Sequence, residues 1–259
     1  MKKYETIEYT LEDEVASIYL NRPDVRNAFN GQMIIELMEL FNALGTHPDV
    51  RVITIEGRGK MFCAGVDLNW MRGVNNYEDD YKAGLKIARC MYDIYTCKKP
   101  TIAKVHGGAF GGATGLIAAC DFVYTVPDTV FSLSEVKIGV VPACISPYVI
   151  NRVGAMRARE LMISGERIGG ADAEKYGLAN KMIAPENLES FVKEKIALIK
   201  TGGPVAIETC KRLVHEVKSM SLDEAQPYTA KLITDLRFSK EGQEGMLSFI
   251  EKRKPNWVK

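Results

Sequence analysis

The sequence predicts an α/β core followed by a helical C-terminal region, and three observations support this prediction. Short β-branched runs alternate with helical patterns over the first two thirds of the 259 residues, as is typical of α/β proteins. Glycines crowd a strand-to-helix junction in "GGAFGGATGLIAACD" (107–121). After about residue 186, amphipathic helical patterns follow one another. We therefore expect a core over 1–195 and a helical region over 196–259.

The first half of the predicted core alternates strand and helix signals. "VASIYLNRP" (15–23) is typical of a strand that ends in a turn. Asn30 can cap a helix with one apolar stripe, because a side-chain oxygen there accepts a bond from a free helical amide. A buried strand is expected within 50–59, and a second helix over 78–96, before Pro100.

The second half continues the alternation and then changes character. The strand "TIAKVH" (101–106) leads into the glycine cluster, and two short strands flank Pro127. The C-terminal part contains four amphipathic helical segments, namely 187–203, 204–220, 222–238 and 241–254.

Composition excludes several classes of protein. Thirty-four Lys and Arg against 33 Asp and Glu leave a net charge of +1, so no field from the whole molecule attracts nucleic acid or acidic membranes. The six cysteines form no CxxC pair, which argues against a zinc site or a disulfide framework. No window approaches ~18 consecutive apolar residues. We expect no metal, no nucleic-acid partner, no membrane insertion and a cytoplasmic location.

The glycine cluster can bind an anion through its backbone. The first amides of a helix have no internal partner and carry partial positive charge, and glycines let a ligand approach them. The spacing fits neither a Walker A loop nor a dinucleotide fingerprint. A tight crossover that needs glycine only for packing is the structural alternative. A second stretch, "GKMFCAGVDLNWM" (59–71), also follows a strand, so two segments can each direct one N–H at a single oxygen.

Six motifs in order over nearly the whole chain resemble the crotonase superfamily, the enoyl-CoA hydratase/isomerase family. They are "NRPDVRNAF" (21–29), "FCAGVDL" (62–68), "GGAFGGATGLIAACD" (107–121), "FSLSEVKIGVVP" (131–142), "ADAEKYGLAN" (171–180) and "FIEKRKPNW" (249–257). The resemblance implies a spiral of ββα repeats with a C-terminal helical region that forms trimers or dimers of trimers. It also implies acyl-CoA thioester substrates, with coenzyme A as part of the substrate and no permanently bound cofactor.

By the same resemblance, the backbone amides of Ala64 and Gly112 form the oxyanion hole for a thioester enolate. Fixed amide dipoles suit this task because they stabilise charge without reorganising. Arg26 matches a position that lies near the CoA phosphates. Phe249 and Lys252 match residues that close over the nucleotide, often from a neighbouring subunit. The CoA-binding backbone is that of Ala64, Gly65, Asp67 and Leu68.

One catalytic position departs from the family pattern. Hydratases of the family usually carry two glutamates, but Gly115 stands at the first position and only Glu135 remains. Burial among apolar neighbours raises the pKa of such a carboxyl toward the range useful for acid–base catalysis. Hydration by Glu135 alone, double-bond isomerisation with a single glutamate, and decarboxylation stay open. A non-catalytic acyl-CoA-binding or RNA-binding homologue is a further alternative.

A second departure favours hydration of a branched 2-enoyl-CoA. Family members usually continue "PGxGGTQRL" after the glutamate segment, whereas this chain has "PACISPYVI" (142–150). In this it resembles bacterial methylglutaconyl-CoA hydratases of leucine breakdown, and also decarboxylases and dehydratases of polyketide β-branching. Ser146, Tyr148 or a nearby basic residue is a candidate contact for an additional substrate carboxylate, and Trp70 a candidate wall of the acyl pocket, with simple packing as the alternative for Tyr148 and Trp70. His106, Cys63 and Cys144 are expected to be structural.

Overall fold

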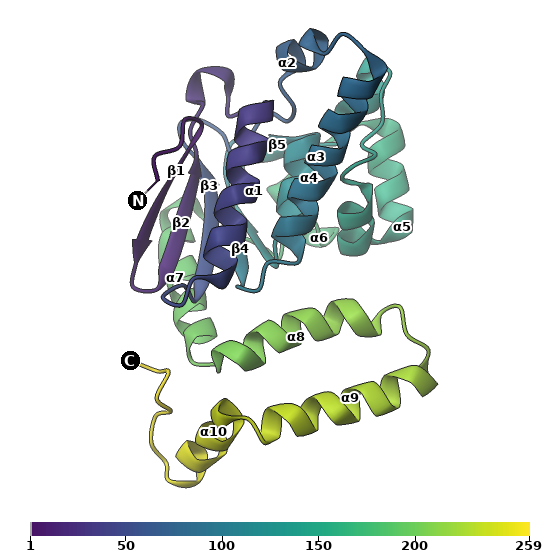
Figure 1. The fold of residues 1–259 in the computed structure, drawn as a ribbon. Helices are drawn as coiled ribbons and strands as arrows, with labels where there is room; N and C mark the ends of the chain where they lie inside the picture. Colours follow the sequence, from purple (N-terminus) through teal and green to yellow (C-terminus); the bar gives the residue numbers. More distant parts are fainter. Residues whose placement is uncertain (1) are drawn as a thin grey trace.

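The computed structural model describes residues 2–259, which form a two-sheet core and a helical arm that extends from it (Figure 1). The larger sheet has the order β1-β2-β3-β4-β6-β9 and the smaller one β5-β7-β8. The strands are β1 (Ile7–Glu12), β2 (Val15–Leu20), β3 (Val52–Gly57), β4 (Thr101–Val105), β5 (Gly108–Phe110), β6 (Phe122–Thr125), β7 (Val130–Ser132), β8 (Arg167–Gly169) and β9 (Lys181–Met182).

Ten α-helices connect and extend these strands in the described residues. They are α1 (Gly31–Thr46), α2 (Leu68–Gly73), α3 (Tyr77–Tyr95), α4 (Gly112–Ala119), α5 (Ser146–Ser164), α6 (Gly170–Lys175), α7 (Leu188–Lys200), α8 (Pro204–Val217), α9 (Leu222–Arg237) and α10 (Lys240–Ile250). Every expected strand and helix is confirmed, including the cap of α1, where Asn30 accepts from the Met33 amide. The sequence analysis did not single out β1, although its residues IEYTLE alternate between apolar and polar as in a half-buried strand.

The larger sheet is parallel except where the hairpin β1-β2 adds an antiparallel edge. In Figure 1, α1 and α3 cover one face and α7 covers the other. A large apolar cluster fills the space under α1, α3 and α4, and a smaller one around Val52, Tyr124 and Val192 lies beneath α7. Helices therefore cover both faces of the larger sheet, and the ends of its parallel strands are the expected place for a ligand.

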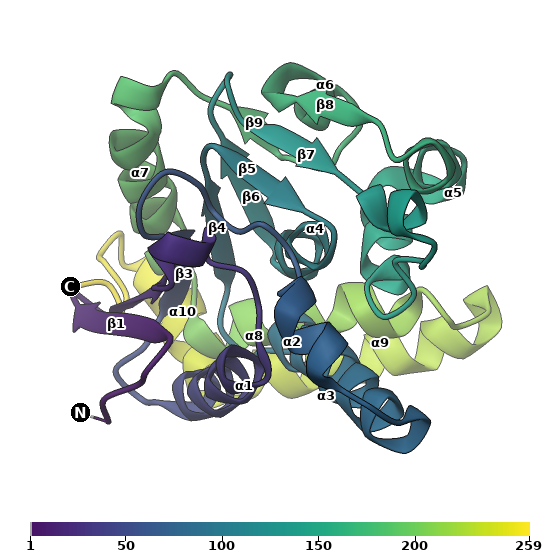
Figure 2. The same cartoon turned by 90° about the horizontal axis from the view of Figure 1, so that it is seen from above.

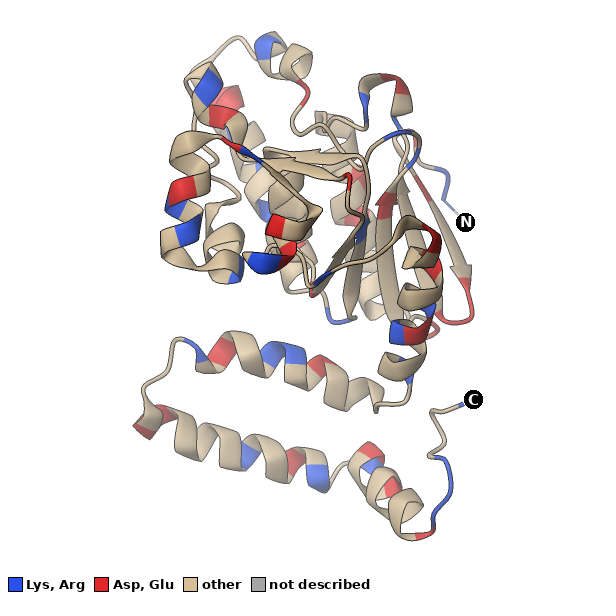
Figure 3. Ribbon diagram, turned by 180° about the vertical axis from the view of Figure 1, so that it is seen from behind, with Lys and Arg blue, Asp and Glu red and all other residues tan. Residues whose placement is uncertain are grey.

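Helices α8, α9 and α10 form the arm (Figure 1). Arg51 is only 9% exposed and donates to the carbonyls of Lys200, Gly202 and Trp257, so it ties both ends of the arm to the core. Charges of both signs alternate along α8 and α9 (Figure 3), which agrees with the near-zero net charge. The expected boundary at 195/196 falls inside α7, one helix before the arm begins.

Two negative findings apply to residues 2–259. No helix there combines the length and apolarity that crossing a membrane requires. No group of three or more His, Cys, Asp or Glu side chains is arranged to hold a metal ion in that part of the chain.

Glu36 provides a test of how the N-terminal hairpin is attached. Its buried carboxylate accepts from the amides of Glu5 and Thr6. Burial alone would raise its pKa, but these hydrogen bonds and those from the Thr6 and Gln32 side chains hold the pKa below its usual value. We expect Glu36→Gln to lower the free energy of unfolding at pH 7 by about 2 kcal/mol, because charge-assisted bonds are lost.

The sign follows from linkage, since a carboxyl with a depressed pKa stabilises the fold at neutral pH and loses that contribution as pH falls through its folded-state pKa. Urea denaturation between pH 7 and pH 3 should therefore show the two proteins converging at the acid end. A constant difference over this range would contradict the assignment. Glu12→Gln, at an exposed position on β1, serves as control.

Candidate active site

Two loops meet at the carboxyl ends of β3 and β4, and their backbones pair directly. The Cys63 amide donates to the Gly108 carbonyl over 3.1 Å, and the Phe110 amide returns a bond of 3.2 Å to the Cys63 carbonyl. Gly65 has a φ of +94°, and a Cβ there would lie 2.6 Å from the Phe110 oxygen. Only glycine fits this approach. The two stretches predicted to act together are therefore held side by side.

The structure corrects one of the two predicted amide donors. The Ala64 amide already donates to the Arg26 carbonyl over 2.9 Å, so it cannot serve a ligand. Val66 follows the positive-φ glycine, and within residues 2–259 no acceptor is assigned to its amide or to that of Gly112. The two residues adjoin, since a Cβ on Gly112 would be 3.2 Å from Val66 Cγ2.

The predicted carboxyl lies beside the same loop. Glu135 belongs to the 3₁₀ helix Ser134–Ile138, and a Cβ on Gly111 would lie 3.0 Å from its Oε1. Its Oε2 is buried without a hydrogen-bond partner in the described structure. Burial raises the pKa of this carboxyl above its ordinary value. A group of this kind can hold or release a proton near neutral pH.

These groups line one cavity of about 600 Å³. Seen from above, α4 lies between α2 and α3 on one side and α5 on the other (Figure 2). The remaining wall is mostly apolar and comes from α2, α3 and the segment 138–145, with Met71, Ile87, Val140 and Ile145 among its residues. An amide pair, an unpartnered carboxyl and an apolar wall thus share one space.

The two departures from the family pattern contact each other. Gly115 is buried in α4, and a Cβ there would lie 2.1 Å from Cγ2 of Ile145. Ile145 comes from the unusual segment 142–150 and is 3% exposed. A second glutamate at 115 therefore has no room. Ile145 was missed in the sequence analysis, because only the fold brings α5 against α4.

The predicted CoA-binding residues fall into two groups. The Arg26 backbone contacts Ala64, and the Arg26 side chain is exposed beside the loop that contains Gly65 and Leu68. Asp67 differs, because its carboxylate caps α2 and pairs with Arg22 over 3.1 Å. Its side chain is structural.

The other two predicted CoA contacts lie away from this loop within one chain. Phe249 ends α10 and is 85% exposed, and Lys252 follows it. In Figure 1, α10 lies at the end of the molecule opposite α2. Neither residue lines the cavity. A single chain thus does not bring the two halves of the expected nucleotide site together.

None of the four predicted pocket residues lines the cavity, and Gly115 is covered by Ile145. Trp70 packs instead on the start of α1, where a Cβ on Gly31 would be 3.2 Å from its Nε1. The Ser146 hydroxyl donates to the Ala143 carbonyl in the first turn of α5. Tyr148 stacks edge-on against Tyr95, with ring centroids 5.3 Å apart, and lines a different cleft. Position 146 is turned by about 100° from Ile145, whereas Tyr148 follows Ile145 by nearly one helical turn and still packs against Tyr95, because only the tertiary packing decides its partner.

The expected structural residues have structural partners. The His106 ring bonds the Gly59 carbonyl over 3.0 Å. Burial raises the pKa of the Cys63 thiol to about 12, and its sulfur lies 3.0 Å from the Asn27 carbonyl oxygen. Burial also raises the pKa of Cys144, which lines the cavity. Thiols held in this protonated form are poor nucleophiles.

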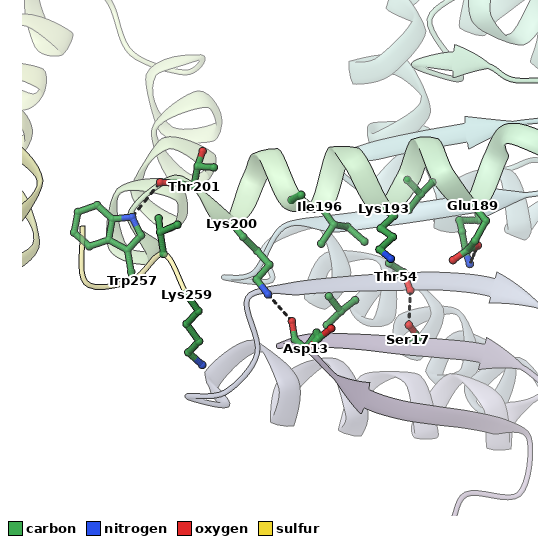
Figure 4. A pocket seen from close by; sticks show the side chains of 15 residues that line it. Asp13, Ser17, Thr54, Glu189, Lys193, Ile196, Lys200, Thr201, Trp257 and Lys259 are labelled. Carbon is green, nitrogen blue, oxygen red and sulfur yellow. Dashed lines mark hydrogen bonds and ion pairs between the residues drawn. The ribbon is translucent and has the colours of Figure 1, made fainter. Parts of the chain in front are cut away.

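A second cavity of about 400 Å³ lies between α7, the outer face of β2 and β3 and the C-terminal segment (Figure 4). Its polar groups bond one another. Thr54 donates to Ser17, Lys200 to the Asp13 carbonyl, and Trp257 to the Thr201 carbonyl. Lys104, which also lines it, pairs with Glu56 and Glu189. We therefore assign the chemistry to the cavity that contains Glu135.

Comparisons with known proteins agree on one family. Residues 10–259 match the family model described as enoyl-CoA hydratase/isomerase. The chain is 32% identical to a crotonyl-CoA hydratase of Syntrophomonas wolfei, with 98% of each covered. It is 28% identical to a peroxisomal Δ(3,5)-Δ(2,4)-dienoyl-CoA isomerase of Arabidopsis thaliana, over 100% of this chain and 99% of the relative. The solved structure of an enoyl-CoA hydratase from Shewanella pealeana superposes with a TM-score of 0.95 at 32% identity, covering 98% of this chain and 97% of that one.

The environment of Glu135 predicts a gain of stability on its removal. A carboxyl with a raised pKa opposes folding once it is ionised, so the protein loses stability as pH rises from the unfolded-state pKa through the folded-state pKa. We expect Glu135→Gln to raise the Tm at pH 7 by roughly 2–4 °C, as for about 1 kcal/mol in a chain of this size. Calorimetry should show the difference shrinking toward pH 4. An unchanged or lower Tm at pH 7 would speak against a desolvated carboxylate.

Proposed function

The chain belongs to the enoyl-CoA hydratase/isomerase family, and we propose that it adds water to a branched 2-enoyl-CoA. One observation carries the proposal. The unpartnered carboxyl of Glu135 and the available amides of Val66 and Gly112 border the same cavity. A thioester oxygen held by the amides would leave the acyl carbons beside the carboxyl. We assign the oxyanion role to Val66 and Gly112 in place of the pair expected from the sequence.

The proposed reaction needs one acid–base group. Ionised Glu135 takes a proton from water as the water oxygen bonds to carbon 3, and the C2=C3 electron pair moves to form the enolate. The amides of Val66 and Gly112 stabilise the negative charge on the thioester oxygen. Protonated Glu135 then gives its proton to carbon 2, which restores the thioester. A raised pKa suits this exchange because burial makes the carboxylate a stronger base toward the water proton.

The cavity wall favours an uncharged acyl chain. Among residues 2–259, no Lys or Arg lines the cavity, and the acidic side chains there are Asp80 and Glu135. A substrate with a terminal carboxylate, such as the 3-methylglutaconyl thioester of leucine breakdown, would gain no ion pair from this chain. We therefore propose 3-methylcrotonyl-CoA as the better substrate of the two.

Isomerisation of a 3-enoyl-CoA is the second candidate. Ile145 occupies the space beside Gly115, so the described chain offers no second carboxyl to position water. A lone carboxyl in an apolar wall can instead remove a proton from carbon 2 and return it to carbon 4. The same amide pair would hold the intermediate enolate.

The arm supports assembly into trimers or dimers of trimers. Its exposed apolar side chains include Leu222, Phe238, Phe249 and Ile250, each at least 69% exposed. Apolar surface of this extent is typical of an interface. We propose that a neighbouring copy covers it, and that Phe249 and Lys252 reach the nucleotide of that neighbour.

Substrate assays separate the two candidate reactions. We expect loss of the enoyl chromophore with 3-methylcrotonyl-CoA, and a lower kcat/KM with 3-methylglutaconyl-CoA. Glu135→Gln should lower kcat by 10²–10⁴-fold, as for loss of a general acid–base group. Turnover of a 3-enoyl-CoA with none of either 2-enoyl substrate would overturn hydration in favour of isomerisation.

The corrected donor can be tested by deleting one N–H. Val66→Pro removes an amide that bonds nothing else in the described chain, and we expect kcat to fall by about 10²–10³-fold. Gly112→Pro should act similarly. Val66→Ala keeps the amide and should retain nearly full activity. Normal turnover by a folded Val66→Pro protein would exclude this amide from the oxyanion hole.

A further inference from the structure

Gly115 and Ile145 form one steric unit, of which Ile145 lines the cavity. A Cβ at position 115 would lie 2.1 Å from Ile145 Cγ2 and 2.3 Å from Ile145 Cβ. Ordinary contacts between carbon atoms are about 3.5–4.0 Å. No side chain at 115 is therefore compatible with isoleucine at 145. The second contact shows that even alanine at 145 would clash, because its Cβ remains.

The helix α4 relates this unit to the carboxyl. Gly111 directly precedes α4, and the Gly115 amide donates to the Gly111 carbonyl over 3.4 Å, so the two positions lie one helical turn apart, about 6 Å. Position 111 faces Glu135, and position 115 faces Ile145. The Ile145 side chain thus lies about one helical turn from the carboxyl, on the cavity side of α4.

Ile145 itself borders the cavity. It is 3% exposed and belongs to the main apolar core, which holds its side chain in place. The Ile145 methyl groups therefore present a fixed apolar surface next to the group that exchanges protons with the acyl chain. An acyl carbon within reach of Glu135 must lie close to this surface.

We infer that Ile145 is a specificity-determining residue that limits the size of the substituent on carbon 3 of the acyl group. This inference rests on the proposed function, because it takes the cavity as the acyl site. A methyl branch fits against Ile145, whereas an ethyl branch meets its side chain. The substrate class is then an uncharged acyl-CoA with a branch no larger than methyl.

Binding of saturated acyl-CoA thioesters tests this without turnover. Isothermal titration of the full chain with 3-methylpentanoyl-CoA and 3-ethylpentanoyl-CoA, which differ by one methylene in the branch on carbon 3, gives the ratio of their Kd values. We expect the unaltered protein to prefer the methyl-branched ligand by at least 10-fold, the scale set by one methylene in an apolar pocket. Ile145→Ala should reduce or reverse this preference, and the Kd of free CoA should not change.

Two further variants serve as a conservative substitution and a matched control. Ile145→Val removes one methylene with less disturbance of the core and should shift the ratio in the same direction by about 3-fold. Ile163→Ala makes the same substitution as Ile145→Ala at a 71% exposed position of α5, and should leave the ratio unchanged. An unchanged ratio in both Ile145 variants would overturn the inference and leave the proposed reaction intact. Failure of the unaltered chain to bind any acyl-CoA would overturn both.

The steric unit has its own test. Gly115→Ala should lower the Tm markedly in the unaltered chain but much less in an Ile145→Gly background, because glycine at 145 removes both short contacts, so the two changes should be non-additive in a double-mutant cycle. A Gly115→Ala protein as stable as the unaltered chain, with the same ratio of Kd values, would show that the two positions do not constrain each other.

Discussion

The close pairing of two backbone segments is the constraint on which the site depends. The loop around Cys63 and the strand β5 exchange backbone hydrogen bonds, and Gly65 fits against the Phe110 carbonyl where no other residue could. This pairing leaves the Val66 amide available beside the first amide of α4. The two amides need not change orientation when charge develops on a bound oxygen, because the sheet and helix on either side hold them rigid. Glycine at these positions lowers the stability of the adjoining helix and strand, and in return a ligand can approach the backbone amides closely.

The same region contains the one buried side-chain oxygen or nitrogen in residues 2–259 that lacks a hydrogen-bond partner. Glu135 places a carboxyl among apolar side chains, and one of its oxygens has no partner. Such an arrangement disfavours the ionised form and so weakens the fold at neutral pH. Acid–base chemistry near pH 7 requires this shift. Stability given up at an unsatisfied group is typical of a functional site.

The two unusual sequence features are best understood as one structural change. Gly115 lies in α4 and Ile145 directly precedes α5, yet isoleucine at 145 leaves room only for glycine at 115. Their contact replaces a polar position with an apolar wall and removes any place for a second carboxyl. In the proposed reaction the acid–base chemistry therefore depends on Glu135 alone, and the shape of the wall gains influence over which acyl group fits. We therefore expect the choice of acyl group to depend on the packing of the cavity wall and not on charge. Among residues 2–259, no Lys or Arg lines the cavity, which agrees with this expectation.

By itself, the sequence determined the strand and helix order, the helical C-terminal part and the residue Glu135, because these follow from periodicity, capping and motif order along the chain. It also marked the two loops, since dense glycine is a local signal. Only the tertiary structure decided which amide is available, because the Ala64 amide is taken by a carbonyl 38 positions away in the chain, on Arg26. It likewise decided that Tyr148 and Trp70 pack elsewhere and that Ile145 borders the site. Contacts between distant segments have no periodic signature, so only the folded chain reveals them.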